Sequence, residues 1–127
     1  LFSAALYYES KFTSALTLLW SIFDPGNKMA FKTRSNFYTL FGCMLKYHDA
    51  TGKNSFDNPR GVQLAVVEFI NKARNQEFDA AQPEIEEYAD AVSRAASDRG
   101  RRARREEILW RLIAEFEGIE QGVAPNT

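Results

Sequence analysis

The stretch RGVQLAVVEFINKAR, residues 60–74, decides the fold class of this chain. Its apolar residues recur every three or four positions, as one face of an α-helix requires. They are Val62, Val66, Phe69, Ile70 and Ala73. A strand needs strict alternation of apolar and polar residues instead, and no segment of the sequence sustains that alternation. The stretch therefore predicts an amphipathic helix with one buried face.

The same spacing recurs on both sides of this stretch and predicts four more helices. Their apolar positions are Phe12, Leu16, Leu19, Trp20 and Phe23; Phe37, Leu40, Phe41, Met44, Leu45 and His48; Ile85, Tyr88, Val92 and Ala96; and Ile108, Leu109, Leu112, Ile113, Phe116 and Ile119. Phe2 and Leu6 either extend the first helix or form a short helix of their own before Ser10. We therefore expect an all-α fold, a single compact bundle of five or six helices.

Helix-breaking residues separate these segments. Asp24-Pro25-Gly26-Asn27 ends the first helix, because proline removes a backbone donor and glycine adopts left-handed dihedrals. A loop of about a dozen residues is expected between Asp49 and Arg60. Pro83 suits the first turn of the fourth helix, and Ser97-Asp98 reads as a break followed by a new N-cap.

Length and composition indicate one domain. A chain of 127 residues with 45% hydrophobic residues can bury its own core without staples. We expect the domain to span residues 1–121 and residues 122–127 to form a flexible tail. Because the chain starts at Leu1, inside an apolar helix, we interpret it as a fragment of a larger protein.

Cysteine content and hydropathy bear on the compartment. Cys43 is the only cysteine, which rules out a disulfide within the chain and favours a reducing cytoplasm. The longest uncharged run, from Phe12 to Phe23, has 12 residues, whereas a membrane helix needs about 20. We therefore expect no membrane partner.

The scarce chemistry-bearing residues give no catalytic constellation. Cys43 and His48 are five residues apart on one predicted helix, about 140° around its axis, so they point in different directions. One cysteine and one histidine also cannot supply a zinc site. Glu86 and Asp90 share a helix face, a spacing that is common on solvated helices. No catalytic residue, cofactor or metal is predicted, and the chain itself is not expected to be an enzyme.

Arginines form the most concentrated local signal. The cluster consists of Arg99, Arg101, Arg102, Arg104 and Arg105. In one interpretation the guanidinium groups bind nucleic-acid phosphates. In the other they pair with acidic residues of the same chain. Candidate residues for such structural pairing are Asp90 with Arg94, four residues apart, and Asp98 with Arg102. Arg101 and Arg105 share a face with Ile108, so at least one of them is expected to lie against the core.

Residues 88–109, YADAVSRAASDRGRRARREEIL, resemble the C-terminal helical region of bacterial modification-dependent restriction proteins of the GmrSD and SspE type. Segments beginning at Phe12 and at Phe31 resemble their upstream paired helices, so the resemblance spans residues 10 to 115. In this family the ParB-like N-terminal domain and an HNH nuclease domain carry the chemistry. No catalytic residue carries over. Asp98, Arg101, Arg102 and Arg105 match the family's Asp-then-Arg pattern.

The resemblance implies a helical module that supports or regulates a DNA-acting domain. We therefore expect a non-catalytic scaffold or interaction domain of a bacterial DNA-defence protein, which packs on the N-terminal domain of its parent protein or on a second copy. A single large apolar surface patch would fit this function. The alternative is direct binding of nucleic acid through the Arg-rich helix at residues 99–105.

Overall fold

A computed structural model describes residues 2–23, 34–93 and 99–119 of the chain. These ranges contain the helices α1 (Phe2–Ser21), α3 (Arg34–Thr51), α4 (Pro59–Arg74), α5 (Glu84–Ser93) and α6 (Arg99–Phe116). Within them, β-type pairing is limited to an isolated bridge between Asp79 and Gln82. The predicted all-α fold is confirmed.

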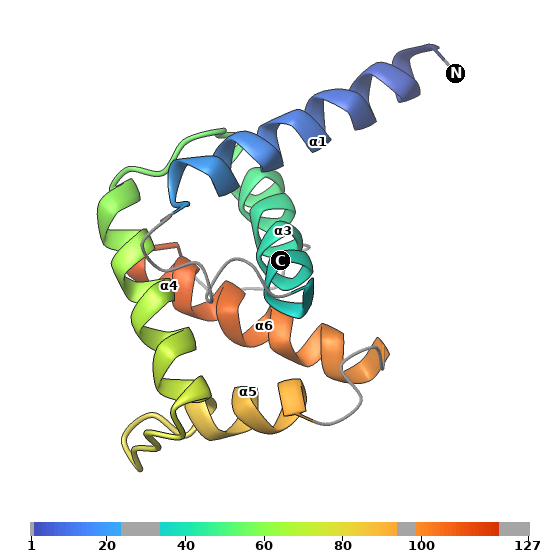
Figure 1. The fold of residues 1–127 in the computed structure, drawn as a ribbon. Coiled ribbons are helices and arrows are strands. Elements are labelled where there is room, and N and C mark those ends of the chain that lie inside the picture. Colours follow the sequence, from blue (N-terminus) through green and yellow to red (C-terminus); the bar gives the residue numbers. More distant parts are fainter. Residues whose placement is uncertain (1, 24–33, 94–98, 120–127) are drawn as a thin grey trace, which may run out of the picture.

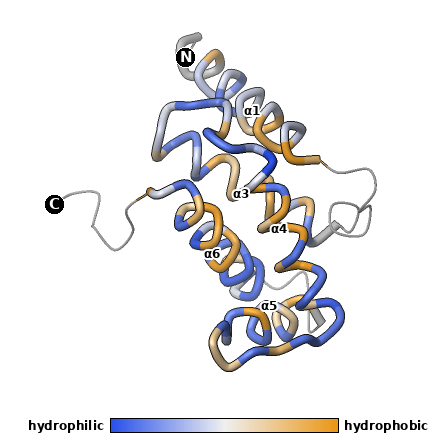
Figure 2. The backbone as a smooth tube through the Cα atoms, turned by 90° about the vertical axis from the view of Figure 1, so that its left-hand side faces the viewer, coloured by the Kyte–Doolittle hydropathy of each residue, from blue (hydrophilic) through white to orange (hydrophobic). Residues whose placement is uncertain are grey.

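Helix α6 lies at the centre of the arrangement (Figure 1). It packs on α3, α4 and α5, while α4 also packs on α5, and α1 packs mainly on α3. α1 and α5 lie at opposite ends of the molecule in both ribbon and tube views (Figures 1 and 2). The N-terminal half of α1 extends past the other helices. None of the described helices is both long enough and apolar enough to cross a membrane.

The core is aliphatic with a few rings, and α4 contributes the face that its sequence predicts. Val62, Val66, Phe69, Ile70 and Ala73 are all buried. In Figure 2, hydrophobic and hydrophilic residues accordingly recur in turn along α4 and α6, as in helices that have one buried face. Every remaining helix also contributes to the core, whose other large buried apolar side chains include Leu18, Leu19, Ile22, Leu40, Met44, Tyr47, Phe56, Ile85, Tyr88, Ile108, Leu109 and Ile113.

Helix α1 exists as predicted, but its buried face includes only Leu19 of the predicted stripe. Phe2 and Leu6 belong to this one continuous helix rather than to a separate short one. Its buried residues are Ala15, Leu18, Leu19 and Ile22. Of the predicted stripe, Phe12, Trp20 and Phe23 remain 54%, 66% and 36% exposed. The reason is that α3 alone covers most of α1, and one neighbouring helix covers only a narrow side of another.

The loop between α3 and α4 is shorter than predicted. α3 continues to Thr51 and α4 begins at Pro59, because Asn58 caps α4: its side-chain oxygen accepts a hydrogen bond from Gly61 N at 3.0 Å. Pro83 directly precedes α5, whose first turn is acidic. The predicted break at residues 24–27, Ala96, the Ser97-Asp98 cap and the tail at 122–127 lie outside the described residues.

Candidate functional site

Arg105, from the arginine cluster, is buried inside the bundle. Its side chain is 1% exposed, and burial lowers its pKa. The Nε atom donates to Thr39 Oγ1 of α3 at 3.4 Å, and Nη1 donates to the carbonyl oxygen of Ala91 in α5 at 3.1 Å. These two acceptors are neutral oxygens. Arg105 therefore ties the N-terminal half of α6 to α3 and α5 and is enclosed by the bundle.

Arg104 is held by two glutamates. Its Nε and Nη2 both donate to Glu87 of α5, the latter at 2.8 Å, and Nη1 lies 3.0 Å from Glu107. Glu107 also pairs with Arg111 at 2.6 Å, as the spacing of four predicts. The hydrogen bonds from Arg104 lower the pKa of Glu87, and those to Glu87 raise the pKa of Arg104. This second arginine of the cluster thus also joins α6 to α5.

The remaining members of the cluster lie nearer the surface. Arg99 and Arg102 are exposed and Arg101 is partly buried. Asp90 is exposed on α5. Arg94 and Asp98 lie outside the described residues, so the pairs Asp90–Arg94 and Asp98–Arg102 stay predictions.

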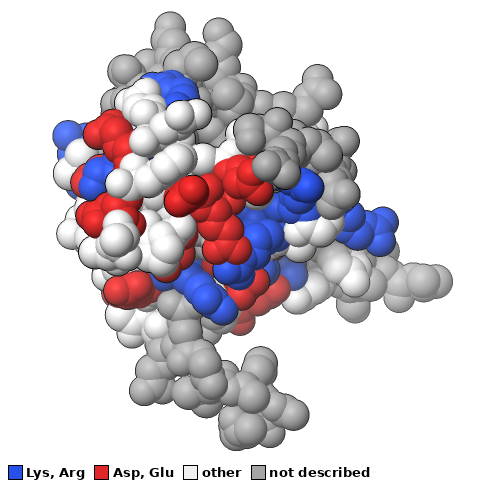
Figure 3. All heavy atoms as spheres, turned by 90° about the horizontal axis from the view of Figure 1, so that it is seen from below, with Lys and Arg blue, Asp and Glu red and all other residues white. Residues whose placement is uncertain are grey.

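Acidic and basic side chains are interleaved where the molecule is seen from its α5 end (Figure 3). α5 carries four carboxylates and no basic residue, while α6 carries six arginines and three glutamates. The two helices are packed together, so their charges largely compensate one another. A phosphate backbone would meet glutamates beside the arginines, which weakens the electrostatic attraction on which such binding depends.

Cys43 and His48 do not form a nucleophile–base pair. Cys43 is fully buried, its thiol donates to the carbonyl oxygen of Glu106 at 3.4 Å, and burial raises its pKa. A thiol whose pKa is raised supplies little thiolate. His48 Nδ1 lies 2.8 Å from the carbonyl oxygen of Lys53, on the loop after α3. Across residues 2–23, 34–93 and 99–119, no three His, Cys, Asp or Glu side chains gather as metal ligands.

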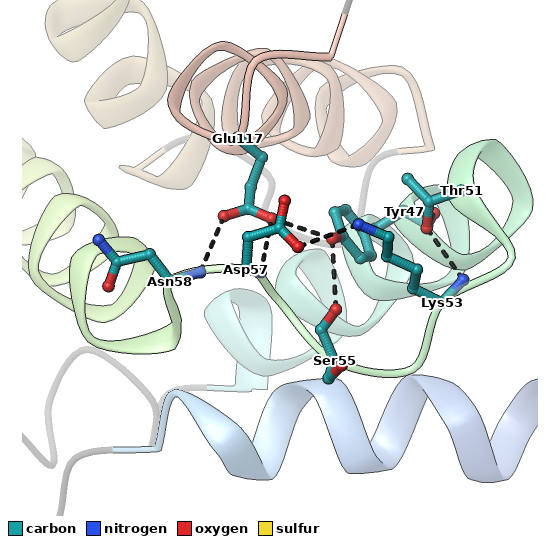
Figure 4. A network of polar contacts seen from close by, with 7 residues as sticks. All are labelled: Tyr47, Thr51, Lys53, Ser55, Asp57, Asn58 and Glu117. Carbon is teal, nitrogen blue, oxygen red and sulfur yellow. Dashed lines mark hydrogen bonds and ion pairs between the residues drawn. The ribbon is translucent and has the colours of Figure 1, made fainter.

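Glu117, just after α6, organises the polar network in Figure 4. One carboxylate oxygen accepts from Tyr47 Oη at 2.9 Å and from Asp57 N at 3.1 Å, and the other accepts from Asn58 N at 3.4 Å. Burial, followed by this hydrogen bond, raises the pKa of Tyr47. The carboxylate lies at the positive end of the α4 dipole. The network holds α3, α4 and the end of α6 together, which is a structural function.

Large apolar side chains gather instead on the outside of α1 and α3. We call this set the aromatic surface; it consists of Tyr8, Phe12, Leu16, Trp20 and Phe23 of α1 and its C-terminal end, and Phe37 of α3. Tyr8, Phe12, Trp20 and Phe37 are 67%, 54%, 66% and 41% exposed. Sequence reasoning assigned Phe12, Trp20, Phe23 and Phe37 to apolar helix faces and thus to the interior, and that part of the prediction is wrong.

Helical spacing arranges the aromatic surface. Tyr8, Phe12, Leu16 and Trp20 follow one another at intervals of four, so they form one strip along α1 beside its buried face. Beside Trp20 lies an apolar groove between α1 and α3, lined by Leu16, Leu19, Trp20, Phe23, Phe37 and Leu40. The centroids of the Trp20 and Phe23 rings are 5.1 Å apart, and those of Phe12 and Phe41 are also 5.1 Å apart. Trp20 and Phe12 of the aromatic surface are therefore each in contact with a second ring.

A signal for this surface was present in the sequence. Apolar residues occupy two adjacent stripes of the first helix, one with Ala15, Leu18 and Ile22 and the other with Phe12, Leu16 and Trp20. Two stripes are wider than one packed neighbour covers, so a helix with a single neighbour leaves one stripe facing solvent or another protein.

Comparisons of the chain with protein-family models, with curated proteins and with solved structures find no match.

Proposed function

We propose that this chain is a helical scaffold and interaction domain without an active site of its own, which binds another protein through the aromatic surface. The observation that carries the proposal is a row of aromatic side chains on α1 that are more than half exposed: Tyr8 at 67%, Phe12 at 54% and Trp20 at 66%. Soluble proteins seldom leave contiguous apolar surface of this extent in contact with water, and such patches typically serve as interaction sites.

The composition of the surface also fits a protein partner. Tyr, Trp and Phe are enriched at the centres of protein interfaces, where they supply most of the binding energy. Two polar side chains on the same helix are neutral: the hydroxyls of Thr17 and Ser21 donate to carbonyl oxygens of their own helix at 2.9 and 2.6 Å. The hydroxyl donors are therefore satisfied within the helix.

The arginine cluster supports an interaction domain more than a phosphate-binding one. Arg105 is bonded within the core, and Arg104 is bonded to Glu87 and Glu107. Those guanidinium groups stabilise the packing of α6 on α3 and α5. We infer that folding is the main function of the cluster, with direct nucleic-acid binding as the alternative to be tested.

We further propose that the domain belongs to a bacterial DNA-defence protein of the restriction type and acts in the cytoplasm. The resemblance of residues 88–109 to the helical region of that family supports this context. The single, buried Cys43 is in keeping with a reducing compartment. In this setting the helical domain would support or regulate a DNA-acting domain of its parent protein.

Site-specific photocrosslinking in the cell of origin tests the interaction surface. A photoreactive phenylalanine at position 12 should yield one discrete protein adduct, because the Phe12 ring is at the partner. Phe78 is the matched control: it is also an exposed phenylalanine, at 44%, but it lies in the α4–α5 connection. Its photoreactive counterpart should give no such adduct.

A second change links the adduct to the surface. Adding Trp20→Glu to the position-12 probe should abolish the adduct, because a carboxylate in an apolar interface must be desolvated without a partner. The proposal is rejected if neither probe is crosslinked, or if the probes at 12 and 78 are crosslinked to the same proteins.

A further inference from the structure

We propose that a second copy of this chain covers the aromatic surface, with α1 packed antiparallel against α1 of the other copy across a twofold axis. This inference rests on the proposed function, because it names the partner of the same surface. Three properties of the surface carry it: its area, the symmetry of its strip and the low number of charges around it.

The exposed area matches one side of a dimer interface. Taking about 200 Å² for each large side chain, the exposed fractions of the aromatic surface amount to about 500 Å². Tyr7 and Tyr38 adjoin it through ring contacts with Tyr8 and Phe37 and are 57% and 56% exposed, which adds about 200 Å². The total of about 700 Å² per copy is close to the roughly 800 Å² that each partner contributes to a standard stable interface.

The strip on α1 is complementary to itself. Its four residues are evenly spaced, so its midpoint lies between Phe12 and Leu16. When two such helices run antiparallel about that midpoint, Tyr8 lies opposite Trp20 of the other copy, and Phe12 lies opposite its Leu16. A twofold interface requires this reciprocity, because each patch must match itself.

The shape of the molecule leaves room for this pairing. The N-terminal half of α1, which carries Tyr8, extends beyond the other helices of its own bundle (Figure 1). In the antiparallel arrangement this half lies along the second copy, next to the groove between its α1 and α3. The rings that project from one copy thus meet the groove beside Trp20 of the other, in the manner of ridges and grooves of packed helices.

Charge favours a second copy over an anionic partner. Among its 20 residues α1 has two charged side chains, Glu9 and Lys11, and Lys11 is bonded to Asp49 at 2.8 Å. Binding to a nucleic acid or to an anionic membrane needs several lysines or arginines along the contact. The whole chain has a net charge of −1, so two copies repel each other little.

Sedimentation velocity of the 127-residue chain, from about 1 to about 300 µM, tests the inference. We expect a concentration-dependent species of twice 14.5 kDa. Phe12→Glu should raise the dimer dissociation constant at least about 100-fold, and the milder Trp20→Ser should raise it less. Phe78→Glu is the control, because Phe78 is a 44% exposed ring in the α4–α5 connection, at the opposite end of the molecule from α1. Circular dichroism verifies that each variant keeps its helices.

The outcomes separate this inference from the proposed function. A monomer at every concentration, or a dimer that Phe12→Glu does not weaken, overturns the second copy as partner. If the purified chain is monomeric and the photoprobe at position 12 is crosslinked to a different protein, the interaction function stands without the dimer. If the probe yields no adduct and the chain is monomeric, both proposals fail.

Discussion

A buried arginine that bonds two neutral oxygens links three helices at a single residue. The guanidinium of Arg105 reaches Thr39 of α3 and Ala91 of α5 from α6, and its charge is desolvated enough to lower its pKa. Spacing along the sequence indicated that Arg101 or Arg105 would face the core, because both share a face with Ile108. It did not indicate which oxygens would accept hydrogen bonds from the guanidinium, since Ala91 and Thr39 are 14 and 66 residues away in the sequence and belong to other helices.

Arg105→Ala should lower the free energy of unfolding by about 3 kcal/mol, because it leaves a cavity and two buried acceptors without their donor. Urea denaturation followed by circular dichroism measures the change. Arg99→Ala, at an exposed position of the same helix, should change the stability by no more than about 0.5 kcal/mol. Equal effects of the two substitutions would contradict a structural function for Arg105.

Glu87 makes the stability of the fold depend on pH. Arg104 lowers its pKa in the folded state, so the pair stabilises the fold fully above the ordinary glutamate pKa of 4.5 and loses that effect as pH falls through the lower, folded value. Glu87→Gln removes the titrating group. The difference in unfolding free energy between wild type and Glu87→Gln should therefore shrink on acidification; a difference that stays constant between about pH 6 and about pH 3 would contradict the pairing.

At the scale of elements, the sequence predicts which segments form helices, but it predicts only in part which face of each helix is buried. For α4 the apolar stripe is narrow and neighbours cover it, so all of the positions predicted as its apolar face are buried. For α1 the apolar surface is wider than the contact with α3. The sequence shows that the helix is apolar, but which stripe is buried depends on where α3 lies, and that is a tertiary property.

The start of α4 depends on a residue from the far end of the described chain. Glu117→Ala should lower the unfolding free energy by about 1–2 kcal/mol, because the backbone N–H groups of Asp57 and Asn58 and the hydroxyl of Tyr47 lose their acceptor. Thermal denaturation with Glu115→Ala as the control measures this, since Glu115 is exposed two residues earlier. An equal loss in both variants would show that Glu117 does not act as a cap.

At the scale of the whole molecule, the charge distribution predicts weak binding of DNA. Fluorescence anisotropy with a duplex of about 20 base pairs at about 150 mM salt should give a dissociation constant above about 100 µM. The reason is that the acidic helix α5 is packed on the arginine-rich helix α6, with Glu87 bonded to Arg104. Micromolar affinity that Arg99→Ala with Arg102→Ala abolishes, while the fold is kept, would instead favour the Arg-rich helix as a nucleic-acid site.

The candidate site was only partly accessible to sequence reasoning. The arginine cluster is conspicuous because like charges stand close together, yet the structure bonds Arg104 and Arg105 to the chain's own groups. The aromatic surface is inconspicuous, because Phe12 and Trp20 look like ordinary core residues until the position of α3 is known. Exposure of an apolar side chain is set by what packs beside it, and a pattern along one helix does not contain that information.

The buried thiol of Cys43, between α3 and α6, can report when these two helices separate. Cys43 is the only cysteine in the chain and is 0% exposed, with its Sγ turned to the Glu106 carbonyl. An alkylating reagent reaches it when these two helices separate. Iodoacetamide modification can therefore be measured on the native protein and on the denatured chain. When the helices reclose quickly, the ratio of the native rate to the denatured rate equals the equilibrium constant for their separation. Arg105→Ala should accelerate the modification, and Arg99→Ala should leave it unchanged.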